Sequence, residues 1–471
     1  MAKKTRVTYM CSECGGEAMK WSGQCPHCGA WNTMVEMKVP EIDDGDKRRR
    51  SSAAPGKASM PGRLRDIVTD AGGERLDTGI GELNRVLGGG IVPGSLTLIS
   101  GEPGIGKSTI IMQAASNIAE KYGPVLYVSG EESEKQIKLR ADRICGEIPA
   151  EFYLLAETNV ENVAAAVEEL KPKFLIIDSI QTMYTQDADS APGSMTQVRA
   201  CGNEFMRIGK VSGVPVFIVA HVTKSGDLAG PKIVEHLVDC VLNFVGERNQ
   251  DLRILRAVKN RFGTTSEIGA FEMGEHGLTE IKDLSRRFLE DMEDDAEGSM
   301  VTAVYEGTRP LLLEVQALTA VSGVGFARRT SIGFDIKRLN MIIAVLERQA
   351  GMQLADQDVY VNVVGGFRPE GTSTDLAVAL AIHSSLAGVK CRKDTLALGE
   401  IGLTGDLRRI QYAERIIKEA ARMGFTRVIL PRSQAKRLGE LKASGAISGT
   451  ESGIKLLAAK NLSDAIRLYR D

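Results

Sequence analysis

The sequence predicts an α/β protein with a mainly parallel sheet, preceded by a small cysteine-containing module and followed by a second α/β domain. Short apolar runs alternate with helical patterns from about 70 to 284, as expected for βαβ units. A glycine-rich turn separates one apolar run from a helical pattern. Two CxxC pairs lie near the start of the chain. Continuous apolar runs are typical of strands buried on both faces, which favours a parallel sheet.

Composition narrows the class of protein. The 471 residues leave room for about three domains. A hydrophobic fraction of 43% and a charged fraction of 25% indicate a soluble globular chain, and no apolar run approaches the length of a membrane span. No apolar segment follows the basic start, so we expect a cytoplasmic protein. The net charge of −2 means that contact with nucleic acid must rest on local basic patches.

The pattern along the chain divides it into five segments. We expect a cysteine module at 1–38, a flexible linker at 39–62, the main α/β domain at 63–288, an acidic linker at 289–299 and a second α/β domain at 300–471. In the main domain the expected strands are LTLIS at 96, VLYVS at 125, FYLLA at 152, FLIID at 174 and VFIVA at 216. In the last domain we expect strands at 359 and 426 and helices at 374 and 413.

The segment GEPGIGKS at 101–108 matches G-x-x-x-x-G-K-[ST], between an expected strand at 96–100 and an expected helix at 107–121. In such a loop backbone N–H groups surround phosphate oxygens, helped by the positive end of the helix. Lys107 should reach the β- and γ-phosphates and Ser108 should ligate Mg²⁺. A purely structural glycine turn is the alternative. The expected ATP or ADP contacts are Gly101, Glu102, Pro103, Gly104, Ile105, Gly106, Lys107, Ser108 and Thr109.

Two acidic positions follow other expected strands. Asp178 ends FLIID, where a carboxylate can hold Mg²⁺, although it could instead cap the next segment. Glu131 and Glu132 follow the strand at 125–129. We expect Glu131 to polarise the attacking water and Glu132 to be a bystander. A solvated acidic pair at the start of a helix is the alternative.

His221 and two cations complete the expected site. His221 follows VFIVA and could sense the γ-phosphate, or simply cap a chain end. Lys259 and Arg261 lie two apart in AVKNRFG, on what should be an exposed edge strand. Two cations there suit the γ-phosphate of a neighbouring subunit, and a solvated edge that blocks aggregation explains them equally well.

Cys11, Cys14, Cys25 and Cys28 form two CxxC pairs with ten residues between them. Four thiolates at this spacing predict tetrahedral Zn²⁺ with no open position, and therefore a structural role. His27 is a rival ligand, but four cysteines already complete the shell. Two disulfides fit poorly with a cytoplasmic chain. A module of this size has little core, so metal binding would supply its folding energy.

The segments LDTGIGELNRVLGGGIVPGSLTLISGEPGIGKST, FLIIDSIQT and KNRFG resemble the RadA/Sms branch of the RecA superfamily over nearly the whole chain. The resemblance implies a RecA-like P-loop core and a hexameric ring with ATP at subunit interfaces. It also implies functional roles for Lys259 and Arg261. The implied activity is a DNA-dependent ATPase that processes single-stranded DNA and branched recombination intermediates beside the RecA recombinase. Loops 181–200 and 222–236 would face the central channel, with Lys224 and Lys232 as phosphate contacts.

Residues 359–432 resemble the proteolytic domain of Lon. Ser373 falls at the position of the nucleophile, but Glu414 stands where that family has its lysine base, and Lys418 is the only substitute nearby. A carboxylate cannot serve as the neutral amine of a Ser-Lys pair. We therefore expect a scaffold for assembly and DNA contact. Two alternatives to a DNA motor stay open: a nucleotide-gated DNA clamp with little turnover, and an ATP-dependent serine protease.

Overall fold

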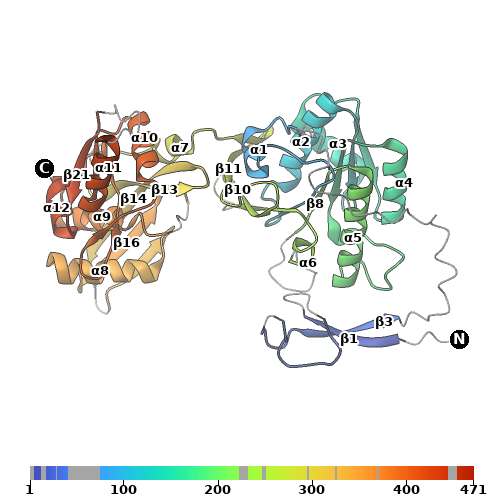
Figure 1. Ribbon diagram of the computed structural model, residues 1–471, viewed down its shortest axis with the longest axis horizontal. Helices are drawn as coiled ribbons and strands as arrows, with labels where there is room; N and C mark the ends of the chain where they lie inside the picture. Colours follow the sequence, from blue (N-terminus) through green and yellow to red (C-terminus); the bar gives the residue numbers. More distant parts are fainter. Residues whose placement is uncertain are drawn as a thin grey trace. The chain divides into compact units, whose positions relative to one another are not determined.

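The computed structural model describes residues 5–11, 17–27, 29–40, 75–221, 232–246, 251–293, 296–323, 326–366, 369, 371–443 and 453–470 (Figure 1). The chain forms two compact units. The first comprises Met1–Arg248, Arg253–Thr265 and Met273–Thr279, and the second comprises Asn249–Leu252, Ser266–Glu272 and Glu280–Asp471. The domain limits expected at 288 and 300 stay predictions.

The cysteine module contains a small antiparallel sheet with the strand order β2-β1-β3. Its strands are β1 (Thr5–Cys11), β2 (Glu17–Ala18) and β3 (Met34–Pro40). The described core consists of Cys11, Cys25 and Met34, with Tyr9 and Ala18 packed against it. So small a core contributes little stability by burial alone.

The sheet of the main domain has nine strands in the order β12-β11-β10-β9-β4-β8-β7-β5-β6. From β9 to β6 every neighbouring pair is parallel. The five predicted strands are confirmed, and so is the mainly parallel sheet. The strands are β4 (Leu96–Ser100), β5 (Val125–Ser129), β6 (Phe152–Ala156), β7 (Phe174–Asp178), β8 (Val216–Val219), β9 (Cys240–Val245), β10 (Leu252–Asn260), β11 (Ile268–Gly274) and β12 (Gly277–Glu280).

Helices cover both faces of this sheet, as βαβ units require. On one face α4 and α5 share a buried apolar cluster with the strands, in which Val163 and Phe205 meet Leu98 and Ile177. On the other face α2 and α3 pack together and contact β5, β6 and β7. The helices are α1 (Gly81–Leu87), α2 (Lys107–Tyr122), α3 (Glu134–Cys145), α4 (Val160–Leu170), α5 (Met195–Ser212), α6 (Lys232–Glu235) and the 3₁₀ turn η3 (Ile180–Thr182).

The prediction that Lys259 and Arg261 lie on an exposed edge strand is wrong. Strand β10, which ends at Asn260, lies between β9 and β11 inside the sheet. The segments IGAFEMG and GLTE form two further strands beyond it, β11 and β12, which the sequence does not predict. A β-bulge shifts the register with β9 between Ala257 and Lys259.

The second unit is built on a seven-stranded mixed sheet, in the order β15-β16-β14-β13-β17-β20-β21. The strands and helices expected at 359, 426, 374 and 413 are confirmed. Helix α9 is buried over most of its length because it packs against β13 and β14 as well as α8 and α12. Helix α10 packs against the same two strands.

The elements of the second unit have the following bounds. Its strands are β13 (Ser299–Glu306), β14 (Arg309–Val321), β15 (Arg329–Ile332), β16 (Gln357–Val363), β17 (Thr395–Ala397), β18 (Glu400–Ile401), β19 (Leu407–Arg408), β20 (Arg427–Pro431) and β21 (Lys455–Ala459). Its helices are α7 (Leu284–Leu289), α8 (Ile336–Ala350), η4 (Val364–Gly366), α9 (Asp375–Ala387), α10 (Ala413–Arg422), α11 (Arg432–Ala443) and α12 (Leu462–Arg470). Among the described residues, no helix is long and apolar enough to cross a bilayer.

Candidate active site

The glycine-rich loop connects β4 to α2, as the sequence predicts. Gly101, Gly104 and Gly106 have φ angles of 147°, 78° and 116°, which side chains other than glycine rarely adopt. A Cβ atom on Gly106 would also lie 2.9 Å from Met273 Cε. Helix α2 begins directly after this turn at Lys107, so its first N–H groups are free of helical partners and are available to an anion.

Lys107 is only 3% exposed, and its ammonium group turns back into the loop. Its Nζ donates hydrogen bonds to the carbonyls of Gly101, at 2.9 Å, and Glu102, at 3.0 Å. Burial lowers the pKa of Lys107 to about 8, although Asp178 and Glu131 oppose this shift electrostatically. The amine therefore carries its charge at neutral pH and loses it as the pH rises through about 8.

Asp178 ends β7, and its carboxylate accepts a hydrogen bond from the hydroxyl of Tyr127 on the neighbouring strand β5. Tyr127 is 1% exposed. Burial and the adjacent Asp178 raise its pKa well above the ordinary value, so the phenol keeps its proton and acts as a donor. Sequence reasoning missed Tyr127. The only signal was a polar tip in the otherwise apolar strand VLYVS.

Glu131 and His221 meet at the carboxyl ends of β5 and β8. His221 Nε2 lies 3.7 Å from Glu131 Oε1, and Glu131 also accepts a hydrogen bond from the Ser179 hydroxyl. Burial, followed by the charge of Lys107, lowers the pKa of His221, so the imidazole is neutral at pH 7. Its buried Nδ1 has no hydrogen-bond partner among the described residues.

These side chains line one cavity of about 410 Å³. Two arginines of α3, Arg140 and Arg143, also line it, and sequence reasoning missed both. Arg140 forms an ion pair with Glu132, so the second of the two adjacent glutamates has a partner on α3. The lining residues are Gly104, Gly106, Lys107, Ser108, Thr109, Tyr127, Ser129, Glu131, Glu132, Ile137, Arg140, Arg143, Asp178, His221 and Met273.

Comparison with known proteins gives close relatives over the whole length. The DNA repair protein RadA of Bacillus subtilis is 45% identical over 464 residues, which cover 98% of this chain and 98% of the relative. The DNA repair protein RadA of Streptococcus pyogenes is 50% identical over 434 residues, covering 92% of this chain and 94% of the relative. The chain belongs to the RadA family of DNA repair proteins.

Family profiles match three parts of this RadA family member. A rubredoxin metal binding domain matches residues 9–36, an AAA domain matches 60–227, and subunit ChlI of Mg-chelatase matches 315–434. The crystal structure of the RadB recombinase aligns with 44% of this chain and all of its own, at 20% identity and a TM-score of 0.35. The predicted fold class is confirmed: an α/β P-loop core with a mainly parallel sheet, an N-terminal zinc ribbon and a ChlI/Lon-like C-terminal domain.

The RadA family segment KNRFG holds its two cations inside the same chain. Lys259 Nζ donates to the carbonyl of Glu235 at 2.9 Å. Arg261 Nη1 lies 2.9 Å from a carboxylate oxygen of Asp239, which is 3% exposed. The same carboxylate accepts from the Leu96 N–H at 3.1 Å, so it is tied to the start of β4. Arg261 therefore neutralises a buried charge of its own subunit.

The structure describes two of the four predicted zinc ligands, Cys11 and Cys25, and both are buried in the N-terminal ribbon of this RadA family member. Cys11 Sγ lies 3.1 Å from Thr33 Oγ1. Cys25 Sγ accepts the N–H of His27 at 3.4 Å, a contact that favours the thiolate form. Cys14 and Cys28 lie outside the described residues. A buried sulfur pair with an N–H directed at one of them fits a metal-binding knuckle.

Of the remaining predicted positions, those that the structure describes are not among the lining residues of the nucleotide cavity. Lys224 lies outside the described residues, and Lys232 is exposed at the start of α6. In the ChlI/Lon-like domain Ser373 Oγ donates to the carbonyl of Ala303 at 3.2 Å. Glu414 and Lys418 lie on α10. Among the described residues, no hydrogen bond joins Ser373 to either of them.

Proposed function

We propose that this RadA family member is a DNA-dependent ATPase that acts in homologous recombination and DNA repair, moving along single-stranded DNA to process branched intermediates. One observation carries the proposal. Lys107, Asp178, Glu131 and His221 line a single cavity directly above the glycine-rich loop. Relatives named DNA repair protein RadA match the chain from end to end, which supports the DNA part of the proposal.

The cavity has the groups that a nucleotide and its metal require. The loop N–H groups and the Lys107 ammonium would hold the phosphates of ATP or ADP. Ser108 Oγ and the Asp178 carboxylate are hard oxygen donors on neighbouring elements, which suits Mg²⁺. Bound Mg²⁺ would neutralise charge that develops on the phosphates. Tyr127 keeps one oxygen of Asp178 occupied and thereby orients the carboxylate.

Glu131 is the proposed base. The Ser179 hydroxyl donates to its carboxylate, and His221 Nε2 lies 3.7 Å away. At this edge of the cavity the carboxylate can orient a water molecule and accept its proton. His221 is the proposed sensor. Its neutral ring carries one N–H, and its buried Nδ1 has no partner among the described residues. Nδ1 can donate to a phosphate oxygen when it carries that proton, and it accepts from water when Nε2 carries it.

Lys259 and Arg261 are proposed to act on the γ-phosphate of a neighbouring subunit in a hexameric ring. To do so, Arg261 must leave Asp239. Lys210 lies 3.9 Å from the same carboxylate and can partly replace its charge. DNA would pass loops 181–200 and 222–236, and Lys224 and Lys232 would contact the phosphates of the DNA backbone. Such contacts weaken as salt rises.

We further propose that Cys11, Cys14, Cys25 and Cys28 bind one structural Zn²⁺, and that the protein works beside the RecA recombinase. The ChlI/Lon-like domain is proposed to be a scaffold without peptidase activity. The hydroxyl of Ser373 is engaged with a backbone carbonyl, which supports this assignment.

ATP hydrolysis measured with and without single-stranded DNA tests the proposed function. We expect DNA to stimulate turnover, and we expect Glu131→Gln to bind ATP normally but to hydrolyse it at least about 100-fold more slowly. Glu132→Gln is the matched control, because Glu132 pairs with Arg140, and it should stay within about fivefold of the parent. Nucleotide binding with no turnover in the parent would favour the DNA clamp. Turnover that DNA leaves unchanged would contradict the proposal.

A further inference from the structure

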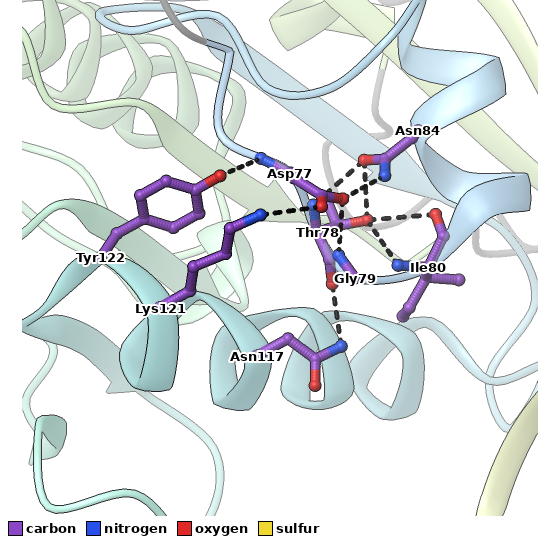
Figure 2. A network of polar contacts seen from close by, with 8 residues as sticks. All are labelled: Asp77, Thr78, Gly79, Ile80, Asn84, Asn117, Lys121 and Tyr122. Atoms are coloured by element: carbon purple, nitrogen blue, oxygen red, sulfur yellow. Dashed lines mark hydrogen bonds and ion pairs between the residues drawn. The ribbon is translucent and has the colours of Figure 1, made fainter.

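A polar network joins the segment before α1 to the C-terminal half of the phosphate-binding helix α2 (Figure 2). Asn117 Nδ2 donates to the carbonyl of Thr78 at 2.9 Å. Lys121 Nζ donates to the carboxylate of Asp77 at 3.1 Å, and the Tyr122 hydroxyl accepts the Asp77 N–H at 3.1 Å. Three side chains of α2 therefore hold one short stretch of chain.

Asn84 closes the network from within α1. Its Nδ2 donates to Asp77 at 2.6 Å, and its Oδ1 accepts the N–H of Thr78 at 3.1 Å. Gly79 is required between them, since its φ is +71° and an added Cβ would lie 2.5 Å from Asn117 Nδ2. Hydrogen bonds from the Gly79 N–H and from Lys121 lower the pKa of Asp77, so this carboxyl stays charged.

The other end of α1 is bound to the KNRFG segment. Asn260 Nδ2 donates to the carbonyl of Val86 at 3.1 Å. The guanidinium of Arg75 bridges the end of α1 and the KNRFG segment, because it donates to the carbonyl of Gly88 at 2.5 Å and to that of Phe262 at 3.0 Å. Helix α1 ends at Leu87, so these donors satisfy carbonyls that have no partner within the helix. We call residues 75–90 the α1 brace.

Backbone packing also ties the α1 brace to the segment after β10. A Cβ atom on Gly88 would lie 3.0 Å from Gly263 Cα, and one on Gly263 would lie 2.9 Å from Gly88 Cα. Strand β10 ends at Asn260, so Phe262 and Gly263 lie beyond its ladder. Asn260 Oδ1 accepts the Phe262 N–H at 2.8 Å, and its Nδ2 donates to the Val86 carbonyl, so Asn260 links the end of the strand to the brace.

We propose that the α1 brace positions Lys259 and Arg261 relative to the nucleotide bound by the same chain, with Asn260 and Arg75 as positioning residues. The inference rests on the proposed roles of Lys259 and Arg261. Helix α2 carries Lys107 at its first residue and the brace anchors Asn117 and Lys121 in its second half. A continuous set of hydrogen bonds therefore connects the nucleotide site of a subunit to the segment that carries its two cations.

Asn260→Asp is the most selective change that the structure offers. An aspartate can still accept the Phe262 N–H but cannot donate to the Val86 carbonyl, which it would repel. We expect the affinity for a fluorescent ATP analogue to stay within about twofold of the parent, and DNA-stimulated hydrolysis to fall about fivefold or more. Asn203→Asp, an exposed position on α5, is the matched control and should change neither quantity.

A double-mutant cycle with Arg261→Ala separates positioning from general loss of stability. If Asn260 acts through Arg261, Asn260→Asp should add little further loss of DNA-stimulated turnover to the Arg261→Ala chain. A role confined to stability would instead add its loss in both backgrounds and lower nucleotide affinity together with turnover. Asn117→Ala, which cuts the brace at α2, should reproduce the Asn260→Asp phenotype and guards against a folding failure of the first variant.

The outcomes distinguish this inference from the proposed function. If the parent chain shows no DNA stimulation, the proposed function fails. If DNA stimulates the parent and Arg261→Ala abolishes the stimulation, while Asn260→Asp and Asn117→Ala both keep it, the α1 brace does not position the cations. Loss of DNA stimulation in both Asn260→Asp and Asn117→Ala, with nucleotide affinity retained, supports the positioning role of the α1 brace.

Discussion

The guanidinium of Arg261 has one partner in the structure and another, the γ-phosphate of a neighbouring subunit, in the proposed mechanism. In the structure it pairs with Asp239, a carboxylate that is 3% exposed and also bound by the Leu96 N–H. Removing the partner of a buried charge is destabilising, because the remaining charge lacks compensation. An Arg261→Ala chain can therefore lose function through lost stability as well as through a lost contact with phosphate.

Asp239→Asn resolves the ambiguity. We expect Arg261→Ala to lower the free energy of unfolding by about 1–3 kcal/mol, since Asp239 is buried although Arg261 is more than half exposed. Adding Asp239→Asn should recover most of that loss, because an amide oxygen can still accept the Leu96 N–H without leaving a buried charge. Urea unfolding of the three chains measures this. Recovered stability without recovered DNA-stimulated turnover would assign Arg261 to the reaction. Recovery of both would make its role structural.

Residues whose role depends on a local pattern could be predicted from the sequence, and those that depend on spatial neighbours could not. Lys107 and Ser108 belong to a loop of fixed spacing, and Asp178 and Glu131 follow recognisable strands. Tyr127 lies in an apolar run, where its hydroxyl gives no periodic signal, and its role exists only because β5 and β7 are neighbours. Arg140 and Arg143 likewise look like the solvated face of a helix.

At the scale of elements, the parallel strands were predictable because their apolar runs are continuous. The position of β10 was not, since β11 and β12 pair beyond it and contain glycine and charged residues that weaken a strand pattern. The contacts of the α1 brace with α2 and with Asn260 join segments more than 30 and more than 170 residues apart. No local pattern in a single sequence reports such contacts.

The cysteine module is the element whose stability should depend most on a ligand. Its described core holds two cysteines and one methionine, so the proposed Zn²⁺ would supply most of its folding energy. We expect one Zn²⁺ per chain, and we expect Cys14→Ser to lose the metal and to expose residues 5–40 to proteolysis. Elemental analysis and limited digestion measure these effects. Cys201→Ser, a buried thiol of α5, is the control and should keep the metal. A Cys14→Ser chain with full zinc content would contradict the four-cysteine site.

At the scale of the whole molecule, the RadA family chain combines an α/β P-loop core with a metal ribbon and a ChlI/Lon-like domain. The nucleotide cavity belongs entirely to the first unit. The two cations that the proposed ring would use in trans, Arg261 and Lys259, are held in this structure by the carboxylate of Asp239 and by the carbonyl of Glu235. Assembly would therefore have to change the partners of side chains that are already engaged, which offers a means of linking turnover to a neighbour.

ATP turnover by Lys107→Ala tests the central claim most directly. Its ammonium group is buried beside the loop carbonyls and faces the cavity that Asp178 and Glu131 line. With single-stranded DNA present, we predict that the variant hydrolyses ATP slower than the parent by about two orders of magnitude or more. Turnover by Lys107→Ala at the rate of the parent would show that this cavity is not where ATP is hydrolysed.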